Sequence, residues 1–238
     1  MEWGTSPKIK LQYNKNNNSY RNCEEDDDYK KLNNIALYSD KNHIYFNDYI
    51  ADETAFALNK MLRSVAKNIK DGDFKYTPNV DSEVMPLYLH IATYGGSVSS
   101  AWSVVDCIKG LDLPVYTVVE GFVASAGTLI TLSGTRKYIT ANSYMLVHEL
   151  STYVCYSRYS EIICETSNIT KEMVHIHEFY LKHTKISKDD LEGILKKDIN
   201  FNADECISYG LADEVYKANT KYEALKKRSW WAFWKWFR

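Results

Sequence analysis

The sequence predicts an α/β domain. Short runs rich in apolar and β-branched residues alternate with segments whose apolar residues recur at helical spacing, and this order repeats at least three times between positions 44 and 134. In the first such helix, Leu58, Leu62 and Val65 fall on one face. Two of the strands, residues 87–92 and 115–119, lead into turns of small residues. The alternation and these junctions together indicate a sheet with helices packed against it.

Each helix and strand is predicted from the spacing of its apolar residues and from the residues at its ends. Asp52 is expected to cap the first helix, and Ser187 with Asp190 to cap a short later one. A long, partly amphipathic helix is expected over about 159–183, and a further short helix over 203–209. Strands are expected at residues 43–46, 87–92, 115–119, 138–140 and 144–148, and the remaining helices at about 52–69, 98–110, 125–133 and 187–195.

Composition limits the classes of function. A chain of 238 residues can form one sizeable core with unstructured ends. The formal net charge of −2 argues against nucleic acid as a partner, because phosphate binding needs a basic excess. The five cysteines are odd in number and far apart, which favours reduced thiols and a cytoplasmic protein. The start lacks the apolar core of a signal peptide, and no apolar run approaches the roughly 20 residues of a membrane span.

A candidate nucleophile lies in the stretch 120–134. The strand at 115–119 leads to Gly121, and small residues then surround Ser125 before an apolar segment resumes. The serine is therefore expected on a tight turn from a strand into a helix. At the first turn of a helix, free N–H groups and the helix dipole favour the negative charge that an acyl-transfer reaction develops.

A serine hydroxyl becomes a good nucleophile when a base takes its proton. A neutral imidazole that a carboxylate holds in one tautomer does this near neutral pH. The sequence offers Ser125, His148 and Asp198 in that order. This order differs from those of the trypsin-like, subtilisin-like and α/β-hydrolase enzymes.

Four stretches carry a resemblance to a known family. Residues 95–98 read Gly-Gly-Ser-Val, residues 121–128 read Gly-Phe-Val-Ala-Ser-Ala-Gly-Thr, and residues 142–148 read Asn-Ser-Tyr-Met-Leu-Val-His. The fourth, residues 198–213, begins at an aspartate and contains Phe, Ala, Glu and Tyr-Gly-Leu at family-like spacing. In this order they resemble the Clp protease proteolytic subunit, ClpP, over about residues 37–215.

The resemblance implies a fold, an activity and roles for residues. The fold would be the ClpP/crotonase-like spiral of strand-strand-helix units, with residues 159–183 as a protruding handle helix. Ser125 would be the nucleophile, His148 the general base and acid, and Asp198 the group that orients the imidazole. The backbone N–H groups of Gly96 and Ala126 would form the oxyanion hole. The chain would hydrolyse peptide bonds of unfolded proteins or short peptides, without a cofactor or metal.

The resemblance also implies partners. Heptameric rings, which in the family stack as a tetradecamer, would enclose the active sites, and an AAA+ ATPase unfoldase is a candidate partner. The sequence departs from the family in three places. Glu149 and Leu150 replace the usual Gln-Pro after the histidine, and residues 151–158 contain no glycine. The segment before position 36 does not resemble the family's short pore-lining segment.

The chain divides by composition into three parts. Residues 1–35 are polar and are expected to form a mobile arm, and residues 36–218 form the peptidase domain. Residues 219–238 form a tail that, from Lys226 onward, carries five positive charges, no acidic residue and six aromatics. This tail either docks on the body or on a neighbouring subunit, or it makes peripheral contact with a membrane surface.

Alternative functions share parts of this pattern. A Ser–Lys peptidase of the signal-peptide-peptidase type would use Lys137, which we interpret as a solvated charge in a polar loop. A phage head-maturation protease of the ClpP-like group would share all four motifs. A ring-forming subunit without catalysis would not need the serine, histidine and aspartate together, and a crotonase-type acyl-CoA enzyme would share only the spiral fold.

Overall fold

The computed structural model of the protein describes residues 12–14, 19–21, 37–74, 84–152 and 158–217. The chain divides into two units, Met1–Ala36 and Leu37–Arg238. In the first, strands β1 (Gln12–Asn14) and β2 (Ser19–Arg21) pair antiparallel. The rest of the predicted arm and the tail at 218–238 lie outside the described residues.

The second unit alternates strands and helices, which confirms the α/β class. Its first half contains β3 (Leu37–Asp40), β4 (His43–Asn47), α2 (Asp52–Lys70), β5 (Leu87–Thr93), α3 (Val98–Lys109), β6 (Val115–Ala124) and α4 (Ala126–Leu132). Its second half contains β7 (Arg136–Ile139), β8 (Tyr144–Val147), α5 (Tyr159–His183), α6 (Lys188–Leu195), β9 (Ile199–Asn202), α7 (Ala203–Ser208) and β10 (Glu214–Val215).

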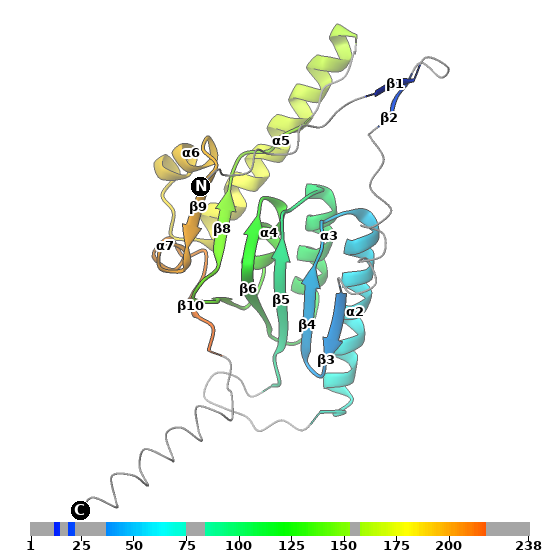
Figure 1. Cartoon of the computed structure of the whole chain (residues 1–238), viewed down its shortest axis with the longest axis vertical. Helices are drawn as coiled ribbons and strands as arrows, with labels where there is room; N and C mark the ends of the chain where they lie inside the picture. Colours follow the sequence, from blue (N-terminus) through cyan, green and yellow to red (C-terminus); the bar gives the residue numbers. More distant parts are fainter. Residues whose placement is uncertain (1–11, 15–18, 22–36, 75–83, 153–157, 218–238) are drawn as a thin grey trace, which may run out of the picture. The chain divides into compact units, whose positions relative to one another are not determined.

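Strand β6 organises the sheet. The strand order is β10-β7-β6-β5-β4-β3, and β8 pairs with β6 and with β9. The first half of β6 pairs with β7, and its second half, at residues 122–124, pairs in parallel with β8. Gly121 lies between the two halves with a φ of +67°, a conformation that glycine adopts without strain. The end of β6 therefore lies beside the end of β8, as Figure 1 shows.

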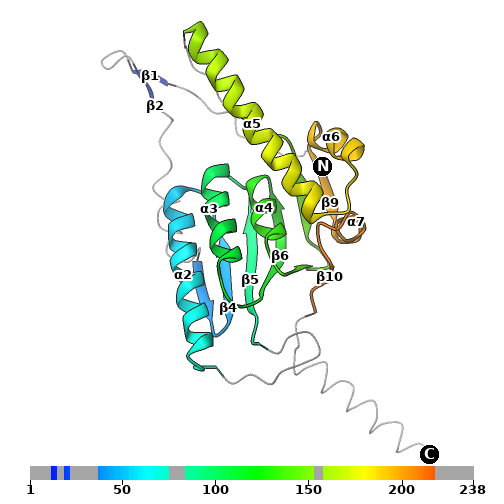
Figure 2. The same cartoon turned by 180° about the vertical axis from the view of Figure 1, so that it is seen from behind.

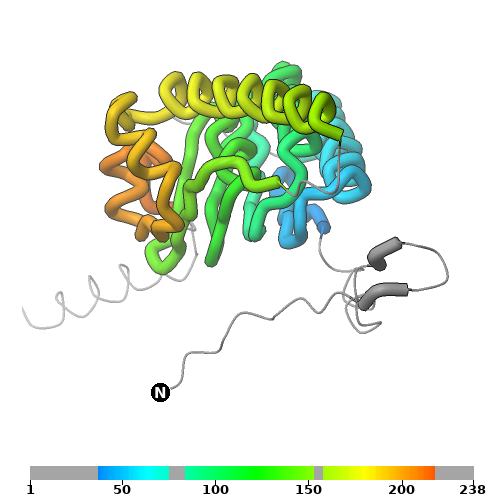
Figure 3. Tube along the Cα trace, turned by 90° about the horizontal axis from the view of Figure 1, so that it is seen from above, coloured from blue at the N-terminus to red at the C-terminus, as the bar shows by residue number. Residues whose placement is uncertain are grey.

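Helices α2, α3 and α4 cover one face of this sheet (Figures 1 and 2). The apolar core lies between them and includes the fully buried Leu58, Leu62, Leu89, Ile91 and Ile130. Helix α5 passes along the same side, in yellow to yellow-green in Figure 3. Among the described residues, no helix is both long enough and apolar enough to cross a membrane.

Several details of the sequence prediction differ from the structure. Ala51, not Asp52, is the N-cap of α2, and the Asp52 carboxylate instead accepts the Ser100 hydroxyl at 2.5 Å. The strand expected at 115–119 continues to Ala124, because its second half finds a new partner in β8. Strand β9 was not expected. Only its Phe201 is buried, so the segment has no strong apolar pattern of its own.

The face of the sheet opposite the helices carries a chain of hydrogen-bonded side chains. His43 Nδ1 lies 2.9 Å from His90 Nε2, and His90 Nδ1 lies 2.7 Å from Glu120 Oε1. An ionised carboxylate only accepts, so His90 donates to Glu120 through Nδ1. One hydrogen can lie between the two rings, so the contact breaks when both facing nitrogens are protonated. Tyr45 stacks on His90, and Tyr88 stacks on His43.

This cluster predicts a loss of stability in mild acid. Burial, and then His90, hold the pKa of His43 below its usual 6.5, and Lys41 acts in the same direction while Asp40 and Glu120 oppose it. The unfolded chain therefore binds more protons than the folded one as the pH falls through 6.5, so the free energy of unfolding decreases there. We expect a smaller decrease in Tm from pH 7.5 to pH 5.5 for His43→Gln than for wild type.

The matched control is His177→Gln, which removes a histidine of α5 outside this cluster. We expect this variant to keep the wild-type decrease in Tm over the same pH range. Equal pH dependence of the His43→Gln variant and the wild-type protein would contradict the assignment.

Candidate active site

Ser125 lies on a strained turn between β6 and α4. Its φ of 54° and ψ of −128° are unusual for a residue with a side chain, and among the described non-glycine residues only Lys41 shares the positive φ. The Ser125 N–H donates to the Leu146 carbonyl at 3.0 Å, and the Ser125 carbonyl accepts the Thr128 N–H at 3.0 Å. Such strain costs about 1–3 kcal/mol and is concentrated at functional sites. The expected strand-to-helix turn at Ser125 is confirmed.

Two backbone N–H groups near Ser125 have no acceptor within the described part of the chain. One belongs to Ala126, whose N–H, at the first position of α4, has no partner inside the helix. The other belongs to Gly96. Ile50 bonds the residues on either side of Gly96, by donating to the Gly95 carbonyl at 2.8 Å and accepting the Ser97 N–H at 2.7 Å. Gly96 and Ala126 line the same pocket as Ser125.

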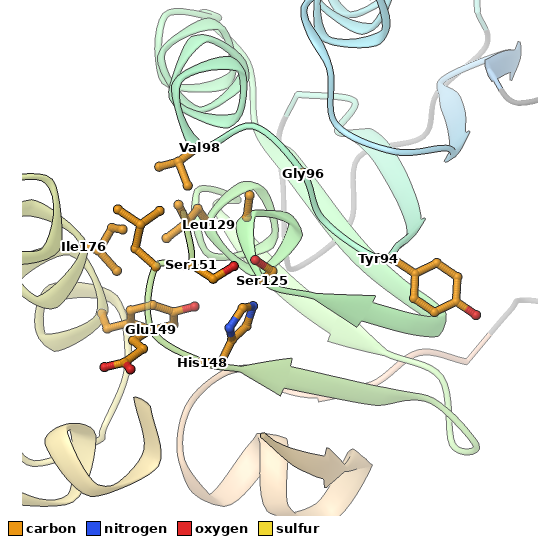
Figure 4. Close-up of a pocket in the computed structure, with 12 residues that line it drawn as sticks. Tyr94, Gly96, Val98, Ser125, Leu129, His148, Glu149, Ser151 and Ile176 are labelled. Carbon is orange, nitrogen blue, oxygen red and sulfur yellow. The ribbon is translucent and has the colours of Figure 1, made fainter. Parts of the chain in front are cut away.

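This pocket, here called the Ser125 pocket, has a volume of about 270 Å³. Figure 4 shows the His148 ring directed toward Ser125 from the end of β8. Apolar side chains form the opposite wall, where Ile176 of α5 lies near Leu129 of α4. The remaining lining residues are Tyr94, Val98, Glu149, Leu150, Ser151 and Tyr180.

His148 and Asp198 are related by the pairing of β8 with β9. The two strands are antiparallel, with Leu146 opposite Asn200 and Val147 opposite Ile199. The same register continued by one residue places His148 opposite Asp198, and opposed residues of an antiparallel pair project to the same side. His148 and the exposed Asp198 also line a second hollow of about 550 Å³.

His148 thus takes part in two hollows, one with Ser125 and one with Asp198. Within the described residues, no side-chain hydrogen bond joins the three to one another. Catalytic hydrogen bonds of this kind are often long or poorly aligned before substrate binds. No cluster of three or more His, Cys, Asp or Glu side chains in the described residues could hold a metal ion.

Lys137, the candidate base of a Ser–Lys peptidase, makes its contacts away from the Ser125 pocket. Its ammonium group donates to the carbonyls of His183 and Gly210, both at 2.8 Å, and lies 3.5 Å from Asp213. The side chain is only 13% exposed, so the interpretation as a solvated charge is wrong. Lys137 joins β7 to the ends of α5 and α7, and it does not line the Ser125 pocket.

The site contains residues that the sequence did not indicate. Thr128 donates its hydroxyl to the Ser125 carbonyl at 2.6 Å, and the same hydroxyl group is hydrogen-bonded to Tyr180. Ser151 also lines the pocket; it begins the stretch 151–158 that departs from the family, of which residues 153–157 lie outside the described residues. A threonine three residues after the serine was a local signal, but nothing in the sequence links it to a tyrosine on a distant helix.

Comparison with known proteins identifies the family. The family model of the Clp protease matches residues 77–219, which is more than half of the chain. The chain belongs to the Clp protease family. A curated relative, ATP-dependent Clp protease proteolytic subunit 2 of Treponema denticola, is 28% identical over 138 residues, which cover 57% of this chain and 68% of the relative.

The predicted family resemblance is therefore confirmed, and the chain is a ClpP-type peptidase, a hydrolase. All of Ser125, His148, Asp198, Gly96 and Ala126 fall within the matched range. Within this range the fold brings Ser125, His148, Gly96 and Ala126 around one pocket, and it places Asp198 with His148 at the second hollow.

Gly95 offers a test of the turn. A Cβ at this position would lie 2.7 Å from the Ser125 Cβ and 2.8 Å from the Ala124 carbonyl oxygen, and the φ of +94° disfavours any side chain. We expect Gly95→Ala to displace Ser125 and to lower kcat for peptide hydrolysis by about 10²-fold. The measurement is kcat on a fluorogenic peptide.

The control is Gly72→Ala. It also replaces a glycine of positive φ, but no atom lies within 4 Å of the added Cβ. It should cost stability without a comparable loss of kcat. If Gly95→Ala kept wild-type kcat, the close packing of the glycine turn against Ser125 would have no catalytic importance.

Proposed function

We propose that this Clp-family peptidase cleaves peptide bonds of unfolded proteins or short peptides through an acyl-enzyme. Ser125 is the nucleophile, His148 is the general base and then the general acid, and Asp198 orients the imidazole. The observation that supports this most is the strained turn that presents Ser125 in one pocket with His148 and with two N–H groups that have no acceptor among the described residues.

The chemistry follows from these positions. His148 accepts the hydroxyl proton as the Ser125 oxygen attacks the peptide carbonyl carbon, and the negative charge that forms on the carbonyl oxygen is held by the N–H groups of Gly96 and Ala126. An oxyanion-hole donor is typically worth about 3 kcal/mol. His148 then gives the proton to the leaving amine as the C–N bond breaks. Water, activated by the same imidazole, hydrolyses the Ser125 ester.

The lining of the Ser125 pocket bears on the substrate. Val98, Leu129, Leu150 and Ile176 form an apolar wall beside the nucleophile. Burying a polar group without a hydrogen-bond partner costs free energy. A substrate side chain next to the cleaved bond would therefore be buried there at the lowest cost in free energy if it were apolar. We therefore expect peptides with an apolar residue at that position to be the better substrates.

Labelling tests the mechanism directly. A fluorophosphonate probe reacts with an activated serine, so the wild-type protein should be labelled and peptide mapping should find the adduct on Ser125. An adduct on another serine, or none, would overturn the proposed nucleophile.

Assembly is proposed from the exposed part of α5. This helix carries exposed apolar side chains that the domain itself does not cover, among them Tyr159 at 81%, Ile163 at 52% and Val174 at 53% exposure. Exposed apolar patches of this kind mark interfaces. Together with the family membership, they support rings of seven subunits that stack through α5 and enclose the Ser125 pockets. An AAA+ ATPase unfoldase would then deliver the substrates.

Sedimentation velocity at micromolar concentration tests the assembly. We expect the wild-type protein to sediment as a large oligomer and Ile163→Glu to shift it to smaller species, because a buried unpaired carboxylate destabilises an interface. Asn168→Glu is the control, since it adds the same charge to an exposed position about 140° around the helix. A monomeric wild-type protein would contradict the proposal.

A further inference from the structure

The backbone of Ser125 is held by more than its own turn. The Ser125 carbonyl accepts two hydrogen bonds from Thr128, one from its N–H at 3.0 Å and one from its hydroxyl at 2.6 Å. Thr128 is completely buried in the first turn of α4. A residue with the dihedral angles of Ser125 keeps them only when its surroundings over-determine them. The Thr128 hydroxyl is one of these constraints.

The Thr128 hydroxyl is itself held from α5. Its oxygen is hydrogen-bonded to the hydroxyl of Tyr180, which is only 2% exposed. Thr128 donates its single hydroxyl hydrogen to the Ser125 carbonyl. Tyr180 is therefore the donor in the bond between the two hydroxyl groups. Burial raises the pKa of Tyr180 to about 12, so the phenol keeps this hydrogen throughout the neutral range.

Tyr180 also belongs to the lining of the site. Together with Ile176, one turn earlier on α5, it lines the Ser125 pocket. The hydroxyl is hydrogen-bonded to Thr128, and the residue also lines the pocket. The two functions of the side chain can therefore be separated, because phenylalanine keeps the ring and loses only the donor.

We propose that Tyr180 and Thr128 are positioning residues for the nucleophile. The order of donation runs from the Tyr180 hydroxyl to the Thr128 oxygen and from the Thr128 hydroxyl to the Ser125 carbonyl. It fixes the backbone angle from which the Ser125 oxygen approaches the substrate. This inference rests on the proposed role of Ser125, and it adds that a residue of α5 sets the geometry of the turn.

The test is a set of four variants on the full chain, assayed with a fluorogenic peptide and with the fluorophosphonate probe. Thr128→Val keeps the shape and removes the hydroxyl. We expect it to lower kcat and the labelling rate by about tenfold or more while KM stays within about twofold, because the substrate pocket is unchanged and the nucleophile is misplaced. Thr128→Ser should restore most of the activity.

The Tyr180→Phe variant should lower kcat by about threefold to tenfold, since the Thr128 hydroxyl remains but is less constrained. The double variant should be no less active than Thr128→Val alone, because Tyr180 acts only through Thr128. Its stability should also exceed that of Thr128→Val, in which the buried Tyr180 hydroxyl has lost its partner. Additive losses of kcat in the double variant would overturn the proposed order.

Thr131→Val is the matched control. It removes a buried threonine hydroxyl of the same helix, which donates to the Gly127 carbonyl at 3.1 Å rather than to that of Ser125. An equal loss of kcat in this variant, or wild-type kcat in Thr128→Val or Tyr180→Phe, would refute the inference. Ser125→Ala separates the two proposals: activity in that variant would overturn the role of Ser125, whereas inactivity with unchanged Thr128→Val kinetics would overturn only the positioning role.

Discussion

Replacing Ser125 with alanine is expected to lower kcat for peptide hydrolysis by about 10⁴-fold or more, the scale of a lost nucleophile in a serine protease. The substitution removes one oxygen from a residue that is only partly buried. The hydrogen bonds that hold the turn use the Ser125 backbone, and they remain in the variant. We therefore expect Tm to change by no more than about 3 °C and assembly to be unchanged.

The measurement compares kcat of purified wild type and Ser125→Ala, with Tm and sedimentation as checks on folding. His148→Ala should be similarly inactive, because nucleophile and base act as a unit. Ser133→Ala is a control on α4 at the C-cap, where the hydroxyl donates to the Ile130 carbonyl and has no contact with the pocket. Retention of more than a few per cent of wild-type activity by Ser125→Ala would rule out the mechanism.

The alternation of strands and helices could be predicted because each element carries its own signal. The helix at 159–183 has the predicted bounds, and Ser187 caps α6 by accepting the Asp190 N–H, as its spacing indicates. The strand-to-helix junctions at Gly95 and Ser125 could also be predicted from nearby residues, because small residues follow buried strands there. These features depend on neighbours within a few positions of the chain.

The features that the sequence did not indicate depend on contacts between residues that are far apart along the chain. Strand β9 forms because it pairs with β8. Its own apolar and polar residues alternate too weakly to predict a strand. Lys137 was placed in a polar loop because its acceptors, the carbonyls of His183 and Gly210, lie 46 and 73 positions away. The bond between Thr128 and Tyr180 spans 52 positions in the same way.

The second large effect concerns the carboxylate partner of His148. Two acidic residues lie beside this histidine, Glu149 and Asp198, and both line the hollow of about 550 Å³. Adjacent residues of an extended chain point to opposite sides, which sets Glu149 away from the His148 ring. Asp198 occupies the position opposite His148 when the β8–β9 register is continued. The register therefore favours Asp198 as the group that orients the imidazole.

We expect Asp198→Asn to lower kcat by about 10³- to 10⁴-fold, because an amide can hold the imidazole in the wrong tautomer while the geometry stays intact. The loss should appear in kcat at pH 7–8, and in a His148→Ala background Asp198→Asn should cause no further loss. Glu149→Gln is the competing variant, with an expected change of less than about fivefold if it lacks this role. A larger loss from Glu149→Gln than from Asp198→Asn would assign the carboxylate to the neighbour of His148, and β9 would then have no part in catalysis.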